Sequence, residues 1–160
     1  MRIAYQTNNP FQTKKIGEAL AKKILGENLK EAAQTIGLEG ELGGGKTTFL
    51  QGFARGLGIK EKILSPTFVI LKKFKIPKTK QSPKQFQYFY HVDCYRLEKI
   101  QDLLVLGFRE ILTHPQNIIA IEWPNIIKEN LPKHTIFISF YFCNHNKRKI
   151  IIKWPKRKKD

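Results

Sequence analysis

Residues 40–47 read Gly-Glu-Leu-Gly-Gly-Gly-Lys-Thr, and this run is the strongest indication of the fold. It matches the phosphate-binding loop G-x-x-x-x-G-K-[ST] at every required position. Glycines let the backbone bend into a cup whose N–H groups point at phosphate oxygens, and a following helix offers its positive end to the same anion. The cup glycines are Gly43, Gly44 and Gly45. We expect Lys46 to reach the β- and γ-phosphates and the Thr47 hydroxyl to ligate Mg²⁺. The loop predicts binding of a nucleoside triphosphate, and the alternative interpretation is a glycine-rich turn.

The residues on either side of this loop have the pattern that such a loop requires. Ala33–Glu39 is a short apolar run that leads into the glycines, as a buried strand does at its carboxyl end. A helix pattern follows from about Lys46 to Leu57, and Gly58 is its stop signal. We therefore expect a strand, then the loop, then a helix.

The rest of the chain alternates helix and strand patterns. Asn9 before Pro10 predicts a helix start, and apolar spacing carries this helix to about Leu25. Gly107 interrupts a later helical pattern at Ile100–Leu112. Five β-branched, aromatic or apolar runs are expected to be strands: Pro66–Ile76, Phe86–Tyr95, Ile118–Ile121, Thr135–Phe142 and Arg148–Trp154. The expected fold is a single-domain, P-loop NTPase-like, three-layer α/β fold with a mixed sheet.

Length and composition exclude several classes of protein. The chain has 160 residues, 41% of them hydrophobic and 26% charged, which suits one globular domain and not a disordered or collagen-like chain. The longest nearly uncharged runs are shorter than the roughly 18 residues of a bilayer span, and the N-terminus has no secretory signal pattern. A cytoplasmic protein without a membrane partner is expected. Cys94 and Cys143 have no metal-ligand spacing, so we expect two buried, reduced thiols.

The charge balance is strongly basic, with 29 Lys plus Arg against 13 Asp plus Glu, a net charge of +16. One interpretation is a polyanionic partner. The other is a lysine-solvated surface, because lysines scattered among Ile, Asn and Phe are also typical of an A/T-rich coding sequence. Basic residues are more concentrated in two segments than elsewhere in the chain. These segments are a basic connector at residues 72–85 and a basic C-terminal tail at residues 153–160, which ends a run that begins at Lys147. Charge alone gives affinity without specificity, so the sequence leaves both interpretations open.

Two acidic residues are candidates for work at the phosphates. Glu122 directly follows the apolar run Ile118–Ile121, where a P-loop protein places the carboxylate that holds the metal's water shell. The alternative for Glu122 is a solvated acid at the end of a strand. Asp93 interrupts an apolar strand, where an unpaired carboxylate is costly. It could orient the attacking water or hold Mg²⁺, or it could form a structural ion pair with Arg96.

Three further features have both a functional and a structural interpretation. Thr67, where a loop enters a strand, could sense the γ-phosphate as switch threonines do, or be an ordinary strand-start hydroxyl. His91 could be an acid or base, although a half-buried strand histidine is the more common case. Trp123-Pro124 could cap the nucleotide or fill the edge of the core.

Four motifs in this order resemble the bacterial TsaE family of tRNA threonylcarbamoyladenosine ATPases: GELGGGKTT (40–48), SPTF (65–68), HVDCYRL (91–97) and EWP (122–124). The likeness spans most of the chain. It implies a small P-loop ATPase that uses ATP and Mg²⁺ and joins the TsaD and TsaB subunits. It also implies that their complex makes N6-threonylcarbamoyladenosine at position 37 of tRNA, with contact between this chain and tRNA expected to be indirect.

The resemblance implies roles for particular residues around the phosphates. Lys46 and Thr47 would hold phosphate and Mg²⁺, with Thr48 beside them. Glu122 would be the second metal ligand, and Asp93 would be essential for hydrolysis. The expected catalytic groups are Asp93, Lys46 and Thr67.

Other implied contacts lie farther from the reacting phosphate. Ser65–Thr67 would form the switch segment, Thr13 would lie near the nucleoside, and Arg148 would be a basic nucleotide contact. The long basic connector, the lysine-rich tail and the high net charge depart from the family pattern. These departures concern the partner surface and leave the nucleotide site unchanged.

The expected reaction is in-line attack of water on the γ-phosphate, in which the protein positions groups and neutralises charge. No arginine finger is evident in the sequence, so we expect slow hydrolysis by the chain alone. Two other functions stay open. A small-molecule kinase would need a lid that usually carries arginines, and after Leu97 the chain has only Arg109 before its C-terminal turn. A non-enzymatic nucleic-acid-binding module is favoured by the basic tail and Trp154.

Overall fold

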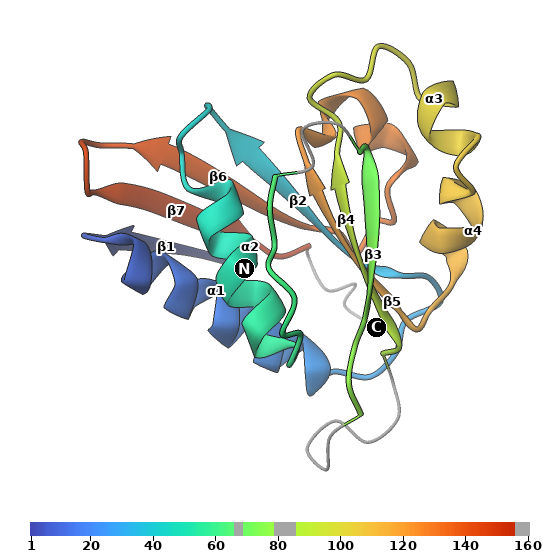
Figure 1. The fold of residues 1–160 in the computed structure, drawn as a ribbon, viewed down its shortest axis with the longest axis horizontal. Coiled ribbons are helices and arrows are strands. Elements are labelled where there is room, and N and C mark those ends of the chain that lie inside the picture. Colours follow the sequence, from blue (N-terminus) through green and yellow to red (C-terminus); the bar gives the residue numbers. More distant parts are fainter. Residues whose placement is uncertain (66–68, 79–85, 156–160) are drawn as a thin grey trace.

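A seven-stranded mixed sheet forms the centre of the protein in a computed structural model that describes residues 1–65, 69–78 and 86–155 (Figure 1). The strand order is β1-β7-β6-β2-β5-β4-β3. The strands are β1 (Arg2–Thr7), β2 (Gln34–Gly40), β3 (Leu71–Lys75), β4 (Tyr88–Asp93), β5 (Asn117–Glu122), β6 (Ile136–Phe142) and β7 (Arg148–Lys153). The four central strands β6, β2, β5 and β4 are parallel, while β3, β7 and β1 pair antiparallel to their neighbours.

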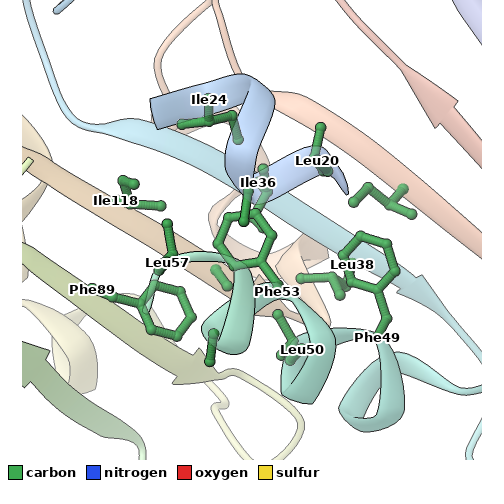
Figure 2. Close-up of a cluster of buried hydrophobic side chains, with 14 of the residues drawn as sticks. Leu20, Ile24, Ile36, Leu38, Phe49, Leu50, Phe53, Leu57, Phe89 and Ile118 are labelled. Atoms are coloured by element: carbon green, nitrogen blue, oxygen red, sulfur yellow. The ribbon is translucent and has the colours of Figure 1, made fainter. Parts of the chain in front are cut away.

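One face of the sheet is covered by α1 (Pro10–Leu25) and α2 (Lys46–Gly56) (Figure 1). The Asn9 side chain caps α1 by accepting a hydrogen bond from the Gln12 N–H at 2.9 Å, as the Asn-Pro signal predicts. Figure 2 shows the core that these helices build with the sheet, with Phe53 of α2 between Leu20 of α1 and Phe89 of β4. Burial of this aromatic and aliphatic cluster fixes α2, and hence the phosphate loop at its start, against the end of β2.

The two helices approach each other at their glycines. A Cβ on Gly52 of α2 would collide with the backbone carbonyl oxygen of Lys14, and one on Gly17 of α1 would collide with that of Phe49. No larger residue fits at either position without moving a helix.

The opposite face carries three short helices, α3 (Gln101–Leu104), α4 (Phe108–Thr113) and the 3₁₀ helix η1 (Pro124–Asn130). Their buried residues pack on β4 and β5; Leu103, Phe108 and Ile127 belong to this second core. Gly107 lies between α3 and α4 and has a φ of 77°, so the predicted interruption of the helical pattern separates two helices. The three-layer α/β fold with a mixed sheet is confirmed.

The structure differs from the sequence interpretation in several elements. Strand β1 and helix η1 were not predicted, and the strand pair β3–β4 is shorter than the runs 66–76 and 86–95. Cys94 is buried as expected, but Cys143 is exposed, so the prediction of two buried thiols is wrong for Cys143, which lies in the turn after β6. Both cysteines are free.

The predicted basic segments are only partly described. Residues 79–85 of the connector and 156–160 of the tail lie outside the described residues. Trp154 is half-buried, and the Nζ of Lys23 lies 4.6 Å from its ring centroid; the nucleic-acid interpretation of this tail stays a prediction. Within the described ranges, none of the helices has the length and apolar character needed to cross a membrane.

Candidate functional site

A pocket of about 640 Å³ opens where β2 passes into α2, at the carboxyl end of the parallel strands. Ligands in open α/β sheets bind at this end. The glycine loop, the first turn of α2 and the ends of β4 and β5 supply most of its lining. Among the lining residues are Thr13, Gly43, Gly44, Gly45, Lys46, Thr47, Thr48, Asp93, Glu122 and Arg148. The structure therefore brings ten of the eleven predicted site residues to one cavity; the eleventh, Thr67, lies outside the described residues.

The loop takes a conformation that its glycines make accessible. Gly43 has a φ of 74°, and Gly45, the N-cap residue directly before α2, has a φ of 100°. Both lie in the left-handed region that side chains disfavour. The Gly44 N–H donates to the Glu41 carbonyl at 3.1 Å, which closes the turn. The first turn of α2, residues 46–48, lines the pocket, and the first N–H groups of a helix have no partner within it and carry the positive end of its dipole.

Lys46 is buried and makes its contacts with the loop itself. Its Nζ donates to the carbonyl oxygens of Gly40 at 2.7 Å and Glu41 at 2.9 Å, and lies 4.3 Å from the centroid of the Trp123 ring. Burial lowers the pKa of Lys46, whereas the carboxylates of Glu122 and Asp93 act to raise it. The ammonium group is thus held at the loop with two acids close enough to affect its titration.

Glu122 and His91 form a buried pair at the ends of neighbouring parallel strands. The Nε2 atom of His91 lies 2.9 Å from Oε1 of Glu122, and the two residues are only 1% and 3% exposed. His91 is therefore fully buried, not half-buried as expected, and Glu122 is not a solvated strand-end acid. Since the imidazole engages one carboxylate oxygen, the orientation of the whole carboxylate is fixed.

Asp93 is the register neighbour of Glu122 across β4 and β5. It accepts a hydrogen bond from the Tyr95 N–H at 2.9 Å and a long one from the Ser65 hydroxyl at 3.5 Å. Burial raises the pKa of Asp93, and the Glu122 carboxylate raises it further. Two acids thus face one pocket from adjacent strands.

The donor set fits Mg²⁺ bound together with a phosphate. A threonine hydroxyl from Thr47 and carboxylates from Glu122 and Asp93 are hard oxygen ligands, which this ion prefers. In the described parts of the chain no group of three or more His, Cys, Asp and Glu side chains could hold a metal by itself. An ion here would rely on phosphate oxygens and water, as Mg²⁺ does at nucleotide sites.

Thr13, predicted to lie near the nucleoside, and Arg148, predicted to be a basic nucleotide contact, also line the pocket. Thr13 is buried, and its hydroxyl lies 2.9 Å from that of Thr7. The Nε–H of Arg148 donates to the Gly43 carbonyl at 3.2 Å, and its Nη1 donates to the Asn144 carbonyl at 2.6 Å. Arg148 therefore holds the phosphate loop from β7 while it lines the pocket.

The aromatic residue Trp123, which the sequence offers as a candidate, lies at the pocket together with residues that the sequence did not single out. Its backbone is left-handed with a φ of 57°, and its ring centroid lies 5.1 Å from that of Tyr95. Trp123 lines the pocket and packs against the second core, and Pro124 is buried, so the dipeptide fills the edge of the core; that Trp123 caps a nucleotide stays a prediction. His145 and Asn146 also line the pocket, although their sequence indicates only a turn.

Comparison with known proteins gives consistent results. The family model described as "Threonylcarbamoyl adenosine biosynthesis protein TsaE" matches residues 7–150. Relatives described as tRNA threonylcarbamoyladenosine biosynthesis protein TsaE include one from Bacillus subtilis, 34% identical over 93% of this chain and 84% of the relative. Another, from Treponema pallidum, is 33% identical over 81% of this chain and 87% of the relative. The crystal structure of Bacillus subtilis YdiB has a TM-score of 0.71 and 29% identity, covering 98% of this chain and 87% of that one.

Proposed function

This chain belongs to the TsaE family of threonylcarbamoyladenosine biosynthesis, and from that premise we propose that it is a Mg²⁺-dependent ATPase that serves this tRNA modification. The observation that carries the proposal is the convergence of the Lys46 ammonium group with two carboxylates, Glu122 and Asp93, at the start of α2. A lysine that binds phosphate and acids that bind a divalent ion are the groups that phosphoryl transfer from a nucleotide needs.

Each group in the pocket has a task in the proposed reaction. Backbone N–H groups of Gly43 and of residues 45–47, together with the Lys46 ammonium group, bind the β- and γ-phosphate oxygens and neutralise charge that develops in the transition state. Thr47 and Glu122 would hold Mg²⁺, which draws charge from the phosphate oxygens when bound. The Asp93 carboxylate orients the attacking water and accepts its hydrogen bond. Thr67 stays a proposed γ-phosphate contact, on the family motif alone.

His91 is a positioning residue in this proposal. Its Nε2 holds Oε1 of Glu122 at 2.9 Å, which leaves the other carboxylate oxygen for an ion or its water shell. Removal of a residue that orients a metal ligand typically lowers the metal affinity about 10–100-fold.

The test is hydrolysis of ATP followed by release of inorganic phosphate. Lys46→Ala should abolish tight nucleotide binding, whereas Asp93→Ala should retain binding and lose turnover. Lys99→Ala, at an exposed lysine outside the pocket lining, is the matched control and should behave as wild type. Normal hydrolysis by Asp93→Ala would remove Asp93 from the mechanism. A phosphorylated acceptor in place of free phosphate would make the protein a kinase.

We further propose that TsaD and TsaB are its partners and that the complex acts in the cytoplasm. An arginine supplied in trans is worth about 10³–10⁵ in rate for P-loop enzymes, so slow hydrolysis alone and faster hydrolysis with TsaD–TsaB are expected. Turnover measured with and without the two subunits tests this. Fast turnover that is equal in both would contradict partner dependence.

A further inference from the structure

Beyond its parallel centre, which ends at β6, the sheet continues into two antiparallel strands, β7 and β1. Helix α1 covers one face of this extension, where Ile150 and Ile152 share a core with Leu20 and Ile24. The described helices of the other layer pack mainly on β4 and β5, and Phe137 of β6 packs against their buried cluster, but no residue of β1 or β7 does. Strands β7 and β1 therefore have a second face that those helices do not cover, although Ile151 at its centre is buried (Figure 1).

Strand register decides which side chains share that second face. Directly paired residues of antiparallel strands point to the same side. One row is Arg2, Lys153 and Phe137, and another is Gln6, Lys149 and Tyr141. The row between them is uncharged: Ala4, Ile151 and Ser139. We define the basic sheet face as the exposed residues Arg2, Gln6, Tyr141, Lys149 and Lys153.

The charges of this face are not balanced within the sheet. Arg2 and Lys153 lie directly opposite each other, an arrangement of like charges that destabilises an antiparallel pair. Strands β1, β6 and β7 contain no Asp or Glu. The acid on the adjoining strand, Glu39, is held by Lys128 at 2.9 Å. An anion from outside the chain would relieve this repulsion.

The face also has an aromatic group suited to a nucleobase. Tyr141 is 50% exposed and stands beside Lys149, with Gln6 on the next strand. Exposed aromatic rings among cations on a sheet are the surface on which single-stranded RNA stacks its bases. Lys149 and Lys153 are about 13 Å apart along the strand, so one extended RNA strand can reach both.

We propose that the basic sheet face binds RNA, with phosphates on Arg2, Lys149 and Lys153 and an unpaired base on Tyr141. An acidic protein would use the cations but has no base to stack on the tyrosine, so the aromatic ring favours RNA. This surface goes beyond the ATPase proposal, because it uses none of the groups that bind nucleotide.

The test is binding of an unmodified tRNA transcript by fluorescence anisotropy over a range of KCl concentrations. The triple variant R2Q/K149Q/K153Q should bind at least about tenfold more weakly, and the slope of log K against log salt should become shallower by about 2. Its ATP affinity should equal that of wild type. Lys46→Ala should lose ATP binding and keep RNA binding, so the two proposals can fail separately.

The matched control is K60Q/K99Q/R109Q, which removes the same number of lysines and arginines from exposed positions away from this face, two in loops and one in α4. It should change RNA affinity less than about twofold. Equal losses in the two triple variants would show that net charge and not this face binds RNA, and would overturn the proposal.

A second variant isolates stacking. Tyr141→Leu should weaken binding of a single-stranded loop by about fivefold or more with an unchanged salt slope, because a stacked base is lost and no charge is removed. Thermal unfolding checks that each variant is folded; if the triple variant is not, Tyr141→Leu and Lys149→Gln alone carry the test. Unchanged binding by Tyr141→Leu, or displacement of RNA by poly-glutamate at equal charge, would identify an acidic-protein surface instead.

Discussion

Asp93 is a carboxylate whose surroundings oppose its charge. Burial raises its pKa above the ordinary 3.8, and Glu122 adds to the effect. Because the folded state favours the protonated carboxyl group, Asp93 makes its full contribution to the free energy of unfolding below pH 3.8. This contribution is lost as the pH rises through the raised pKa. Asp93→Asn should therefore be more stable than wild type at pH 7, with the difference shrinking toward pH 4, while hydrolysis is lost. Chemical unfolding at several pH values measures this, and a variant less stable at pH 7 would contradict the assigned cause.

The buried histidine gives a second prediction for a single residue. His91→Gln should lower the affinity for ATP in the presence of Mg²⁺ about 10–100-fold and leave the affinity in EDTA nearly unchanged, because only the orientation of Glu122 is affected. Titration with a fluorescent ATP analogue measures both values. His134→Gln is the control, since its Nε2 contacts the Ala33 carbonyl away from the pocket. An equal loss of ATP affinity in EDTA would show that His91 supports the pocket by packing and not by orienting Glu122.

The sequence predicts the positions of some site residues better than those of others. Lys46 and Thr47 follow from local spacing, because the loop and the helix that position them are contiguous. The pairing of His91 with Glu122 joins residues 31 positions apart and depends on the parallel register of β4 and β5. No local pattern carries that register, so His91 could be predicted as a strand residue and not as a partner of the acid.

Among elements, the contact between α1 and α2 is sensitive to a single methyl group. Gly52→Ala would drive a Cβ into the Lys14 carbonyl oxygen, so we expect a loss of about 2 kcal/mol or more in the free energy of unfolding, measured with urea. Gly26→Ala is the control, because a Cβ there meets ordinary contacts at 3.5 Å and should change stability little. Equal stability of the two variants would mean that the helices can separate without cost.

Elements with strong periodicity or clear end signals could be predicted, and those without were missed. Asn9-Pro10 marks the start of α1, and the continuous apolar run of β5 indicates a strand covered on both faces. Strand β1 is mostly exposed and has no apolar alternation, because it lies at a sheet edge. Helix η1 begins at a left-handed Trp123, a backbone state that composition does not indicate.

In the molecule as a whole, the two thiols differ in how accessible they are to a reagent. Cys143 is exposed, whereas Cys94 is buried in the second core, where burial raises its pKa to about 12. Native protein should react with one equivalent of a thiol reagent at neutral pH, and the second thiol should react only when the core opens. Mass spectrometry during urea unfolding measures this; rapid labelling of both thiols in buffer would show that the second core opens readily.

The pairing of β1 with β7 also has a consequence for synthesis. The Trp154 N–H donates to the Met1 carbonyl, so the first strand made joins the last strand made. While the ribosome is still synthesising the central strands, β7 does not yet exist, so the backbone N–H and C=O groups of β1 have no strand to pair with. The nascent chain should thus acquire its helices and parallel centre before its outermost strands, and full resistance to protease should arrive only after residue 153 has cleared the exit tunnel.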